Sequence, residues 1–274
     1  MPTWSGKKAT DDRIRGIKNF KRLRTLRLCR SSISDDGIAM LKDAVNLEVV
    51  YIESDLLTDR SMETLCGLPN LVSLLLDEVP LVTDIGIAQL ERRRELAELY
   101  LIGTHLTDRG VESFKHLNGL WSLHLDRTLI TDGGVASLGT MRDLRLLSLR
   151  GTQVVGYGLC GLFNNPHLDI YLDGCPIDDA AIVEAAHHLP GLNRLSLMDT
   201  PVTDACLPAL ASLEKLQLLR LSGTSITDEG LLHLCGRRTP MTLEVYSTAV
   251  TTQAAAKIRA TSNEVLLTGV GKKI

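Results

Sequence analysis

Hydrophobic and polar positions follow one fixed order along this 274-residue chain. Residues 96–117, for example, read LAELYLIGTHLTDRGVESFKHL. In the first half, leucines alternate with variable residues at a period of two, which indicates a short strand with one buried face. In the second half, Val111, Phe114 and Leu117 are spaced three apart, which indicates the buried stripe of a short helix. The pattern predicts a unit of one strand followed by one helix.

A Thr-Asp or Ser-Asp pair stands between the two halves of the unit. Full pairs begin at residues 10, 34, 58, 83, 107, 131, 203 and 227, and degenerate copies begin at 155, 178 and 251. The step between copies is 23 to 25 residues throughout, and such a period is the signature of stacked repeats. Thr or Asp ahead of the apolar stripe predicts a helix N-cap, because its oxygen accepts a hydrogen bond from an unpaired amide of the first turn.

The pattern LxxLxLxxTxITDxGLxxLxxL resembles the leucine-rich-repeat family. It is most similar to the subclass with repeats of about 24 residues and an I-T-D-x-G-L segment, found in cysteine-containing F-box adaptors and in bacterial repeat proteins. The resemblance covers residues 10–270. It departs from the subclass in having Thr where Cys or Asn is usual, with Cys175 as the one cysteine there, and in having no F-box ahead of the repeats.

The resemblance implies an α/β fold: a right-handed solenoid in the form of an arc, with parallel strands on the concave face and short helices on the convex face. The residues agree with it, because one repeat cannot bury its apolar stripe without a neighbour stacked on it. We therefore expect one leucine-rich-repeat domain over residues 1–274. In it, residues 1–23 form an N-terminal capping half-repeat and about ten repeats extend to residue 270.

Composition places the chain in a broad class. Apolar residues make up 44 % and charged residues 23 %, which is typical of a globular protein. The six cysteines include no CxxC pair, so we expect free thiols in a reducing compartment. The N-terminus lacks the apolar stretch of a signal peptide, and no apolar run has the length of a membrane-spanning helix. These features predict a cytoplasmic location.

Charge is distributed unevenly around the net value of −3. Residues 1–30 contain ten basic and two acidic side chains, so that the rest of the chain is acidic. Two interpretations of this basic segment remain open: a solvated end cap, or a contact with nucleic acid or another anionic surface.

Catalytic and metal-binding patterns are weak. His187 and His188 follow Glu184, but adjacent side chains on a helix diverge, which is a poor arrangement for a metal. Gly156, which stands where Asp is usual, indicates a degenerate cap at which Asp would be neutral or stabilising. The Arg92–Arg94 run indicates a solvated turn on the outer surface. We predict no enzyme, no catalytic residue, no metal and no cofactor.

The strand residues that do not enter the core are predicted to line the concave face. Over repeats two to seven, six of them are acidic and one is basic. Tyrosine and tryptophan concentrate at protein interfaces, although aromatic residues also simply fit a flat sheet. The predicted partner-binding residues are Tyr51, Glu53, Leu75, Asp77, Glu98, Tyr100, Ile102, Trp121, His124, Asp126, Asp169, Tyr171 and Asp173.

These residues predict a monomeric, non-enzymatic protein-interaction module. Its partner would be a protein with a basic surface, and neither nucleic acid, whose phosphates the acidic side chains repel, nor a membrane. The alternative is a substrate-recognition adaptor in ubiquitin-type or effector signalling, with its activity in another domain or partner.

Overall fold

The computed structural model describes residues 3–5, 9–15, 20–235, 237–261 and 264–271. The chain divides into two compact units. The first consists of Met1–Ile130 and Thr140–Leu144, and the second of Thr131–Gly139 and Arg145–Ile274.

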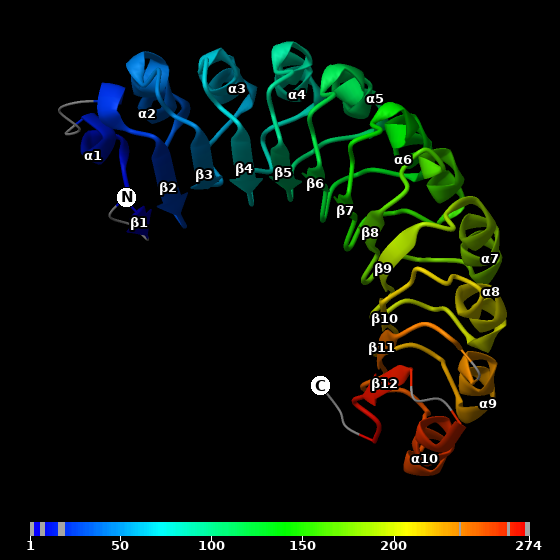
Figure 1. Cartoon of the computed structure of the whole chain (residues 1–274). Coiled ribbons are helices and arrows are strands. Elements are labelled where there is room, and N and C mark those ends of the chain that lie inside the picture. The colour runs from blue at the N-terminus through cyan, green and yellow to red at the C-terminus, as the bar shows by residue number, and fades with distance from the viewer. Residues whose placement is uncertain (1–2, 6–8, 16–19, 236, 262–263, 272–274) are drawn as a thin grey trace. The chain divides into compact units, whose positions relative to one another are not determined.

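In the first unit, parallel strands pair in chain order, and a helical segment follows each of β1 to β5 (Figure 1). The strands are β1 (Thr3–Ser5), β2 (Thr25–Cys29), β3 (Val49–Glu53), β4 (Ser73–Asp77), β5 (Glu98–Ile102) and β6 (Ser122–His124). The helical segments are α1 (Asp11–Arg15), η2 (Phe20–Arg22), α2 (Asp35–Ala39), η3 (Met40–Asp43), α3 (Asp59–Gly67), α4 (Asp84–Ile87), η4 (Ala88–Arg92), α5 (Asp108–Val111) and η5 (Glu112–His116).

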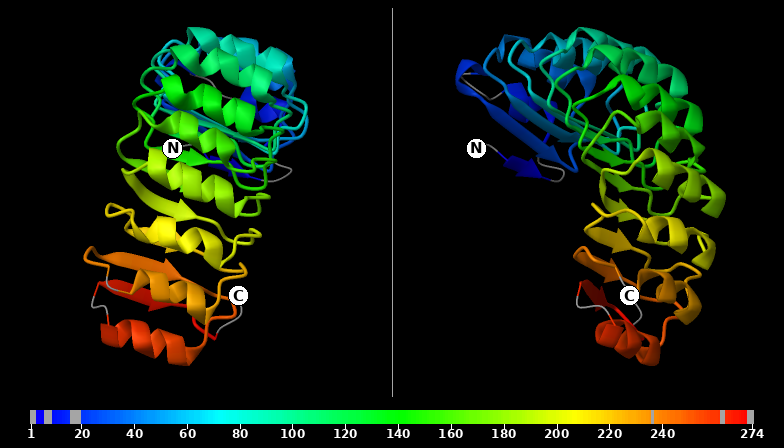
Figure 2. Two further views of the ribbon diagram at one scale, coloured as in Figure 1. Left: turned by 90° about the vertical axis from the view of Figure 1, so that its right-hand side faces the viewer. Right: turned by 45° about the vertical axis from the view of Figure 1, so that its right-hand side comes forward.

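The second unit repeats this plan, again with parallel strands in chain order (Figure 2). Its strands are β7 (Leu146–Ser148), β8 (Leu168–Tyr171), β9 (Leu192–Ser196), β10 (Leu218–Arg220), β11 (Met241–Glu244) and β12 (Val265–Thr268). Its helical segments are α6 (Asp132–Ser137), η6 (Leu138–Thr140), η7 (Tyr157–Leu162), α7 (Asp179–His188), η8 (Asp204–Cys206), α8 (Leu207–Ala211), α9 (Asp228–Leu231), η9 (Leu232–Leu234) and α10 (Thr252–Thr261).

Each unit has two layers, strands on one side and helices on the other, with the core between them (Figures 1 and 2). The register expected from the sequence is confirmed. Leu99, Leu101, Val111, Phe114 and Leu117 are all at most 2 % exposed. The strand–helix repeat is therefore confirmed within each unit. The N-terminal segment, expected to hold a helical half-repeat, also contains a strand, because β1 pairs with β2; Ile17 lies outside the described residues.

The Thr-Asp pair both caps a helix and links neighbouring repeats. The Oγ1 atom of Thr107 accepts a hydrogen bond from the N–H of Arg109 at 3.3 Å, which makes the threonine the N-cap. Asp84 of the preceding repeat accepts from the N–H and the hydroxyl of the same Thr107, at 2.8 and 2.5 Å. The pattern recurs at Asp11–Ser34, Asp35–Thr58, Asp59–Thr83, Asp179–Thr203, Asp204–Thr227 and Asp228–Thr251.

This ladder of carboxylates explains the glycine of the I-T-D-x-G-L segment. A Cβ atom on Gly110 would lie 2.4 Å from the Oδ1 atom of Asp84. Glycine therefore leaves the space in which the aspartate of the preceding repeat reaches its threonine. The sequence predicted the cap but not this link between repeats.

Gly156 interrupts the ladder in the second unit. Its φ of +117° lies in the left-handed region, which glycine adopts without the steric cost that a side chain adds. Asp132 accepts from the N–H groups of Val155, Gly156 and Gly158 at 2.8 to 3.0 Å, and no side chain caps η7. The prediction of a degenerate cap is confirmed. The prediction that Asp would be neutral or stabilising there is wrong, because any side chain is strained at this φ.

Candidate binding surface

The outward-pointing strand residues of β2 to β6 form what we call the first sheet face. Strand register places Tyr51 beside Leu75, Leu75 beside Tyr100, and Tyr100 beside His124. Each residue of this central row is half-buried, and the residues next to it in the same strand point into the core. Glu53, Asp77 and Ile102 form the adjacent row.

Tyr100 and His124 form a stacked pair within the central row. Their ring centroids are 3.8 Å apart and the ring planes differ by 10°. Burial, followed by the charges of Glu98 and Asp126, raises the pKa of Tyr100, while a hydrogen bond with Ser122 opposes the shift. The phenol therefore stays neutral at physiological pH, and each ring covers one face of the other.

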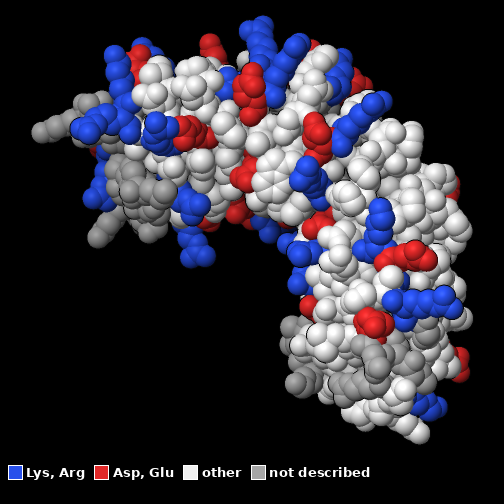
Figure 3. Space-filling view, in the orientation of Figure 1, with Lys and Arg blue, Asp and Glu red and all other residues white. Residues whose placement is uncertain are grey.

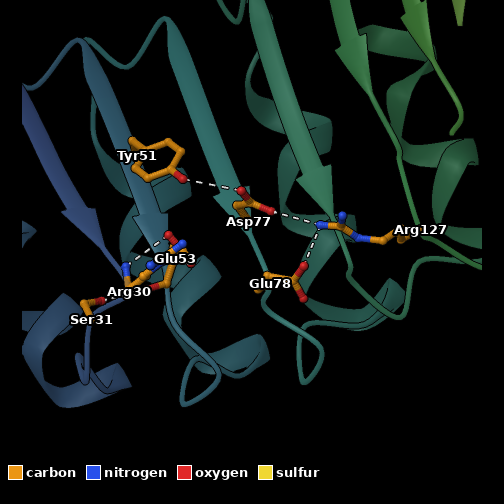
Figure 4. Close-up of polar contacts among 7 residues, drawn as sticks. All are labelled: Arg30, Ser31, Tyr51, Glu53, Asp77, Glu78 and Arg127. Carbon is orange, nitrogen blue, oxygen red and sulfur yellow. Dashed lines mark hydrogen bonds and ion pairs between the residues drawn. The ribbon is translucent and has the colours of Figure 1, made fainter. Parts of the chain in front are cut away.

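Tyr51 is held in a polar network at the end of the central row (Figure 4). Its hydroxyl lies 3.4 Å from Oδ2 of Asp77, and Asp77 and Glu78 both contact Arg127, at 3.4 and 2.5 Å. Burial, followed by the charges of Asp77 and Glu53, raises the pKa of Tyr51 to about 12. The hydrogen bond to Asp77 orients the phenol, and the nearby acidic charges favour its neutral form.

Glu53 meets the turn that follows β2. One carboxylate oxygen accepts from the N–H of Arg30 at 3.1 Å, and the other lies 3.7 Å from the Nε atom of Arg30 (Figure 4). The carbonyl oxygen of Glu53 accepts from both the N–H and the hydroxyl of Ser31, at 2.8 and 3.0 Å. The side chain of Arg30 is 85 % exposed, so that the charge of Glu53 is only loosely balanced from within the chain.

The remaining predicted residues of this unit differ in their exposure. Glu98 accepts a hydrogen bond from the hydroxyl of Ser73 at 2.7 Å. Trp121 stands before β6 and is 41 % exposed, which makes it an apolar edge to the first sheet face. Ile102 is half-buried, whereas Asp126 is buried with 8 % exposure. Asp126 therefore has the position expected from the sequence but little surface to offer a partner.

The outward-pointing residues of β7 to β11 form the second sheet face, where the predicted residues engage the chain's own arginines. Asp173 binds Arg150 at 2.8 Å, and Arg150 also lies over the ring of Tyr171, 4.7 Å from its centroid. Asp169 lies 3.8 Å from Arg194. Asp173 further accepts from the N–H of Met198 at 3.0 Å and from the hydroxyl of Ser196. These carboxylates hold neighbouring repeats together.

Charged side chains also cover the helix side of the first unit, where lysine and arginine mix with acidic residues (Figure 3). Arg92 and Arg94 are exposed there, as predicted. Arg93 corrects the prediction of a solvated run, because it is 9 % exposed and donates to the carbonyl oxygen of Leu71 at 3.0 Å. The sequence does not indicate this hydrogen bond, because a run of three arginines is typical of a solvated turn.

The cysteines match the expectation of free thiols. All six are free. Cys66 and Cys235 occupy the same position in two different repeats, and both are half-buried. Burial raises the pKa of Cys66 to about 12, so that its thiol stays protonated and unreactive at neutral pH. Cys29 lies on the first sheet face as predicted.

Among the described residues, no helix is both long enough and apolar enough to cross a membrane.

Searches of protein-family models and of curated proteins find no match to this chain. Among solved structures, an internalin (inlF) from Listeria monocytogenes superposes with a TM-score of 0.55, at 19 % identity over 90 % of this chain and 80 % of that chain. An internalin C2 (inlC2) from the same organism superposes with a TM-score of 0.53, at 25 % identity over 76 % of this chain and 84 % of that chain. Internalins are leucine-rich-repeat proteins, so this likeness shows an α/β leucine-rich-repeat solenoid fold. The particular repeat subclass and the similarity to F-box-associated proteins stay predictions.

Proposed function

We propose that the chain is a non-enzymatic protein-interaction module whose partner docks on the first sheet face. The single observation that supports this most is the central row, in which Tyr51, Leu75, Tyr100 and His124 adjoin across four strands. Aromatic residues supply much of the energy at protein interfaces, because they bury a large area and keep a polar end.

The arrangement of the rings favours binding over a purely structural role. Stacking fixes Tyr100 on His124, and the hydrogen bond to Asp77 fixes Tyr51. Side chains already held in place lose less conformational freedom when a partner covers them. A role in sheet packing alone would not need half-exposed rings in one row.

The proposed partner presents a basic surface. The first sheet face carries three acidic residues and one basic residue at its strand positions: Glu53, Asp77 and Glu98 against Arg27. The arginines nearest to Glu53 and Asp77 are themselves 85 % and 56 % exposed. Such solvated ion pairs are weak, so that lysine or arginine from a partner can replace them. Phosphates of a nucleic acid would be repelled.

In the same proposal the chain is a cytoplasmic monomer that binds neither a membrane nor a nucleic acid. Six free cysteines support a reducing compartment.

A comparative pull-down tests this function. The wild-type chain, the double variant Tyr51→Ala with Tyr100→Ala, and the helix-side control Arg92→Ala are each immobilised and exposed to the same lysate. We expect a protein retained by the wild type and by the control and lost from the double variant. Circular dichroism confirms that all three baits are folded. Retention of the same proteins by all three would contradict the proposal.

A further inference from the structure

A thiol, a carboxylate and an imidazole meet on the helix side of the second unit. Cys160 belongs to η7, and Glu184 and His188 belong to α7 in the next repeat. One ligand atom from each lies within 4.8 Å of those from the other two. Among the described residues, this is the only group of three or more His, Cys, Asp or Glu side chains arranged in this way.

A hydrogen bond holds the imidazole of His188. The Nδ1 atom of His188 lies 2.9 Å from the carbonyl oxygen of Glu184. A carbonyl oxygen can only accept, so Nδ1 carries the proton and Nε2 keeps its lone pair. Histidines that bind metals are commonly held in this way, because a hydrogen bond from the second nitrogen fixes the tautomer and the ring orientation.

The cluster lies where the carboxylate ladder is interrupted. Gly156 occupies the position from which an aspartate would reach the next repeat, and Asp178 instead donates its N–H to the carbonyl oxygen of Val155 at 2.9 Å. Cys160 and Glu184 follow this broken step in η7 and α7. A bond between these two segments would take the place of the carboxylate–threonine hydrogen bonds that link neighbouring repeats elsewhere in the chain.

We propose that Cys160, Glu184 and His188 bind one zinc ion that ties η7 to α7, with water as the fourth ligand. Thiolate, imidazole and carboxylate are the three ligand types of zinc sites, at distances of about 2.0 to 2.3 Å from the ion. These distances place the ligand atoms of a tetrahedral site roughly 3.3 to 3.8 Å apart. Closing the group from 4.8 Å needs movement of about 1 Å.

The side chains permit this movement. Glu184 and His188 are exposed, and Cys160 is half-buried at the base of the group. On binding, the sulfur–proton bond of Cys160 breaks, its proton passes to solvent, and the sulfur donates its electron pair to the ion. The ion-free state holds a thiol hydrogen-bonded to Glu184 instead.

Metal titration of the whole chain tests the proposal, after dialysis against a chelator and under reducing conditions. Cobalt serves as a coloured probe, because a cobalt–thiolate bond gives an ultraviolet charge-transfer band and a tetrahedral site gives strong visible bands. Zinc affinity follows from competition with a chromophoric chelator. We expect one equivalent of either ion, with zinc displacing cobalt.

The variants identify the ligands. Cys160→Ser should abolish the charge-transfer band. His188→Ala removes a direct ligand and should weaken zinc binding by more than the roughly 10- to 100-fold that loss of a ligand's hydrogen-bond partner costs. The matched controls are His187→Ala on the same helix and Cys235→Ser in another repeat, and both should bind like the wild type. His188 is exposed, so that its variant stays folded whether or not it binds metal. Zinc should also raise the melting temperature of the wild type but not that of Cys160→Ser.

Three results would overturn the proposal: a wild-type chain without the charge-transfer band at saturating cobalt, equal zinc affinity in His188→Ala and the wild type, or loss of binding in Cys235→Ser. None of them bears on the first sheet face, which lies in the other unit.

Discussion

The two sheet faces are built on the same backbone and carry different chemistry. On the first, aromatic residues adjoin across strands and acidic residues outnumber basic ones by three to one. On the second, three acidic residues each contact one of three arginines, in the pairs Asp173–Arg150, Asp169–Arg194 and Glu244–Arg220.

The difference distinguishes the residues that every repeat needs for stacking from the outward strand residues that can vary. Core leucines, threonine caps and ladder aspartates recur in both units, with the exception of the step at Gly156 and Asp178, because stacking of the repeats depends on them. The strand positions that point outward vary between the units. Outward carboxylates pair with arginines of the same chain in both units, but the paired arginines are 85 % and 56 % exposed in the first unit and 31 % to 50 % exposed in the second.

The largest expected effect breaks the scaffold of the first unit. Leu123→Asp places a charge at a position with 0 % exposure, and a buried, unpaired charge costs several kcal/mol. We expect loss of the cooperative unfolding transition, monitored by the fluorescence of Trp121 in the same unit. The matched control, Leu129→Asp, alters a leucine that is 44 % exposed in the same repeat. Similar melting curves for the two variants would contradict the register described here.

A second pair of variants compares a feature found in both units, a buried arginine that donates hydrogen bonds to backbone carbonyl oxygens. Arg93 donates to one buried carbonyl oxygen, whereas Arg237 donates to those of Ala211, Leu213 and Leu216. Leaving buried acceptors without donors costs about 1 to 3 kcal/mol. Arg237→Ala should therefore destabilise the chain by about 2 kcal/mol and Arg93→Ala by less, in urea denaturation. The exposed Arg92 is the control, and a loss in Arg92→Ala as large as in the other two would refute these roles.

A third prediction concerns the interrupted step of the ladder. Gly156→Ala should cost about 1 kcal/mol, because alanine is strained at a φ of +117°. Gly67→Ala should cost nothing, since a Cβ atom there has no neighbour within 4 Å. Chemical denaturation measures both, and a neutral Gly156→Ala would show that the glycine is not needed for its backbone geometry.

The smallest effect is a pH dependence in the first unit. The folded state raises the pKa of Tyr51 from 10.0 to about 12, so the folded chain holds this proton more tightly than the unfolded chain. The contribution of Tyr51 to stability is complete below pH 10 and is lost as the pH rises towards 12. Ultraviolet titration should show late-ionising tyrosine absorbance in the wild type, and Tyr51→Phe should lose the part of it that titrates near pH 12. A titration that is the same in both proteins would contradict the network around Asp77.

The sequence could predict features that depend on periodicity. A period of two identified Tyr51, Leu75 and Tyr100 as outward-pointing, and a spacing of three identified the helical stripe through Phe114, because both patterns are set by local backbone geometry. Contacts one repeat apart were harder to predict. The hydrogen bond from Thr107 to Asp84 and the approach of Cys160 to Glu184 depend on how one turn of the solenoid lies against the next.

Other features could not be predicted because the adjacent sequence indicates a different environment. Arg93 lies between two exposed arginines, so that only its contact with Leu71 distinguishes it. Asp169 and Asp173 look available in the sequence, yet their arginine partners stand in other repeats. When the repeats are aligned with one another, each of these aspartates lies beside an arginine of a neighbouring repeat. That alignment could predict the two ion pairs from the sequence.

The most direct test of the central claim is kinetic binding of the captured partner to Tyr100→Ala, Tyr171→Ala and Arg92→Ala. If the first sheet face is the binding surface, Tyr100→Ala weakens binding by about 2 kcal/mol, or about 30-fold, mainly through faster dissociation. Tyr171→Ala, whose ring already lies under Arg150, should lose less, and Arg92→Ala should match the wild type. Wild-type kinetics for Tyr100→Ala, together with loss of binding when Lys21 and Arg22 are replaced by alanine, would contradict the account and place the surface in the basic N-terminal segment.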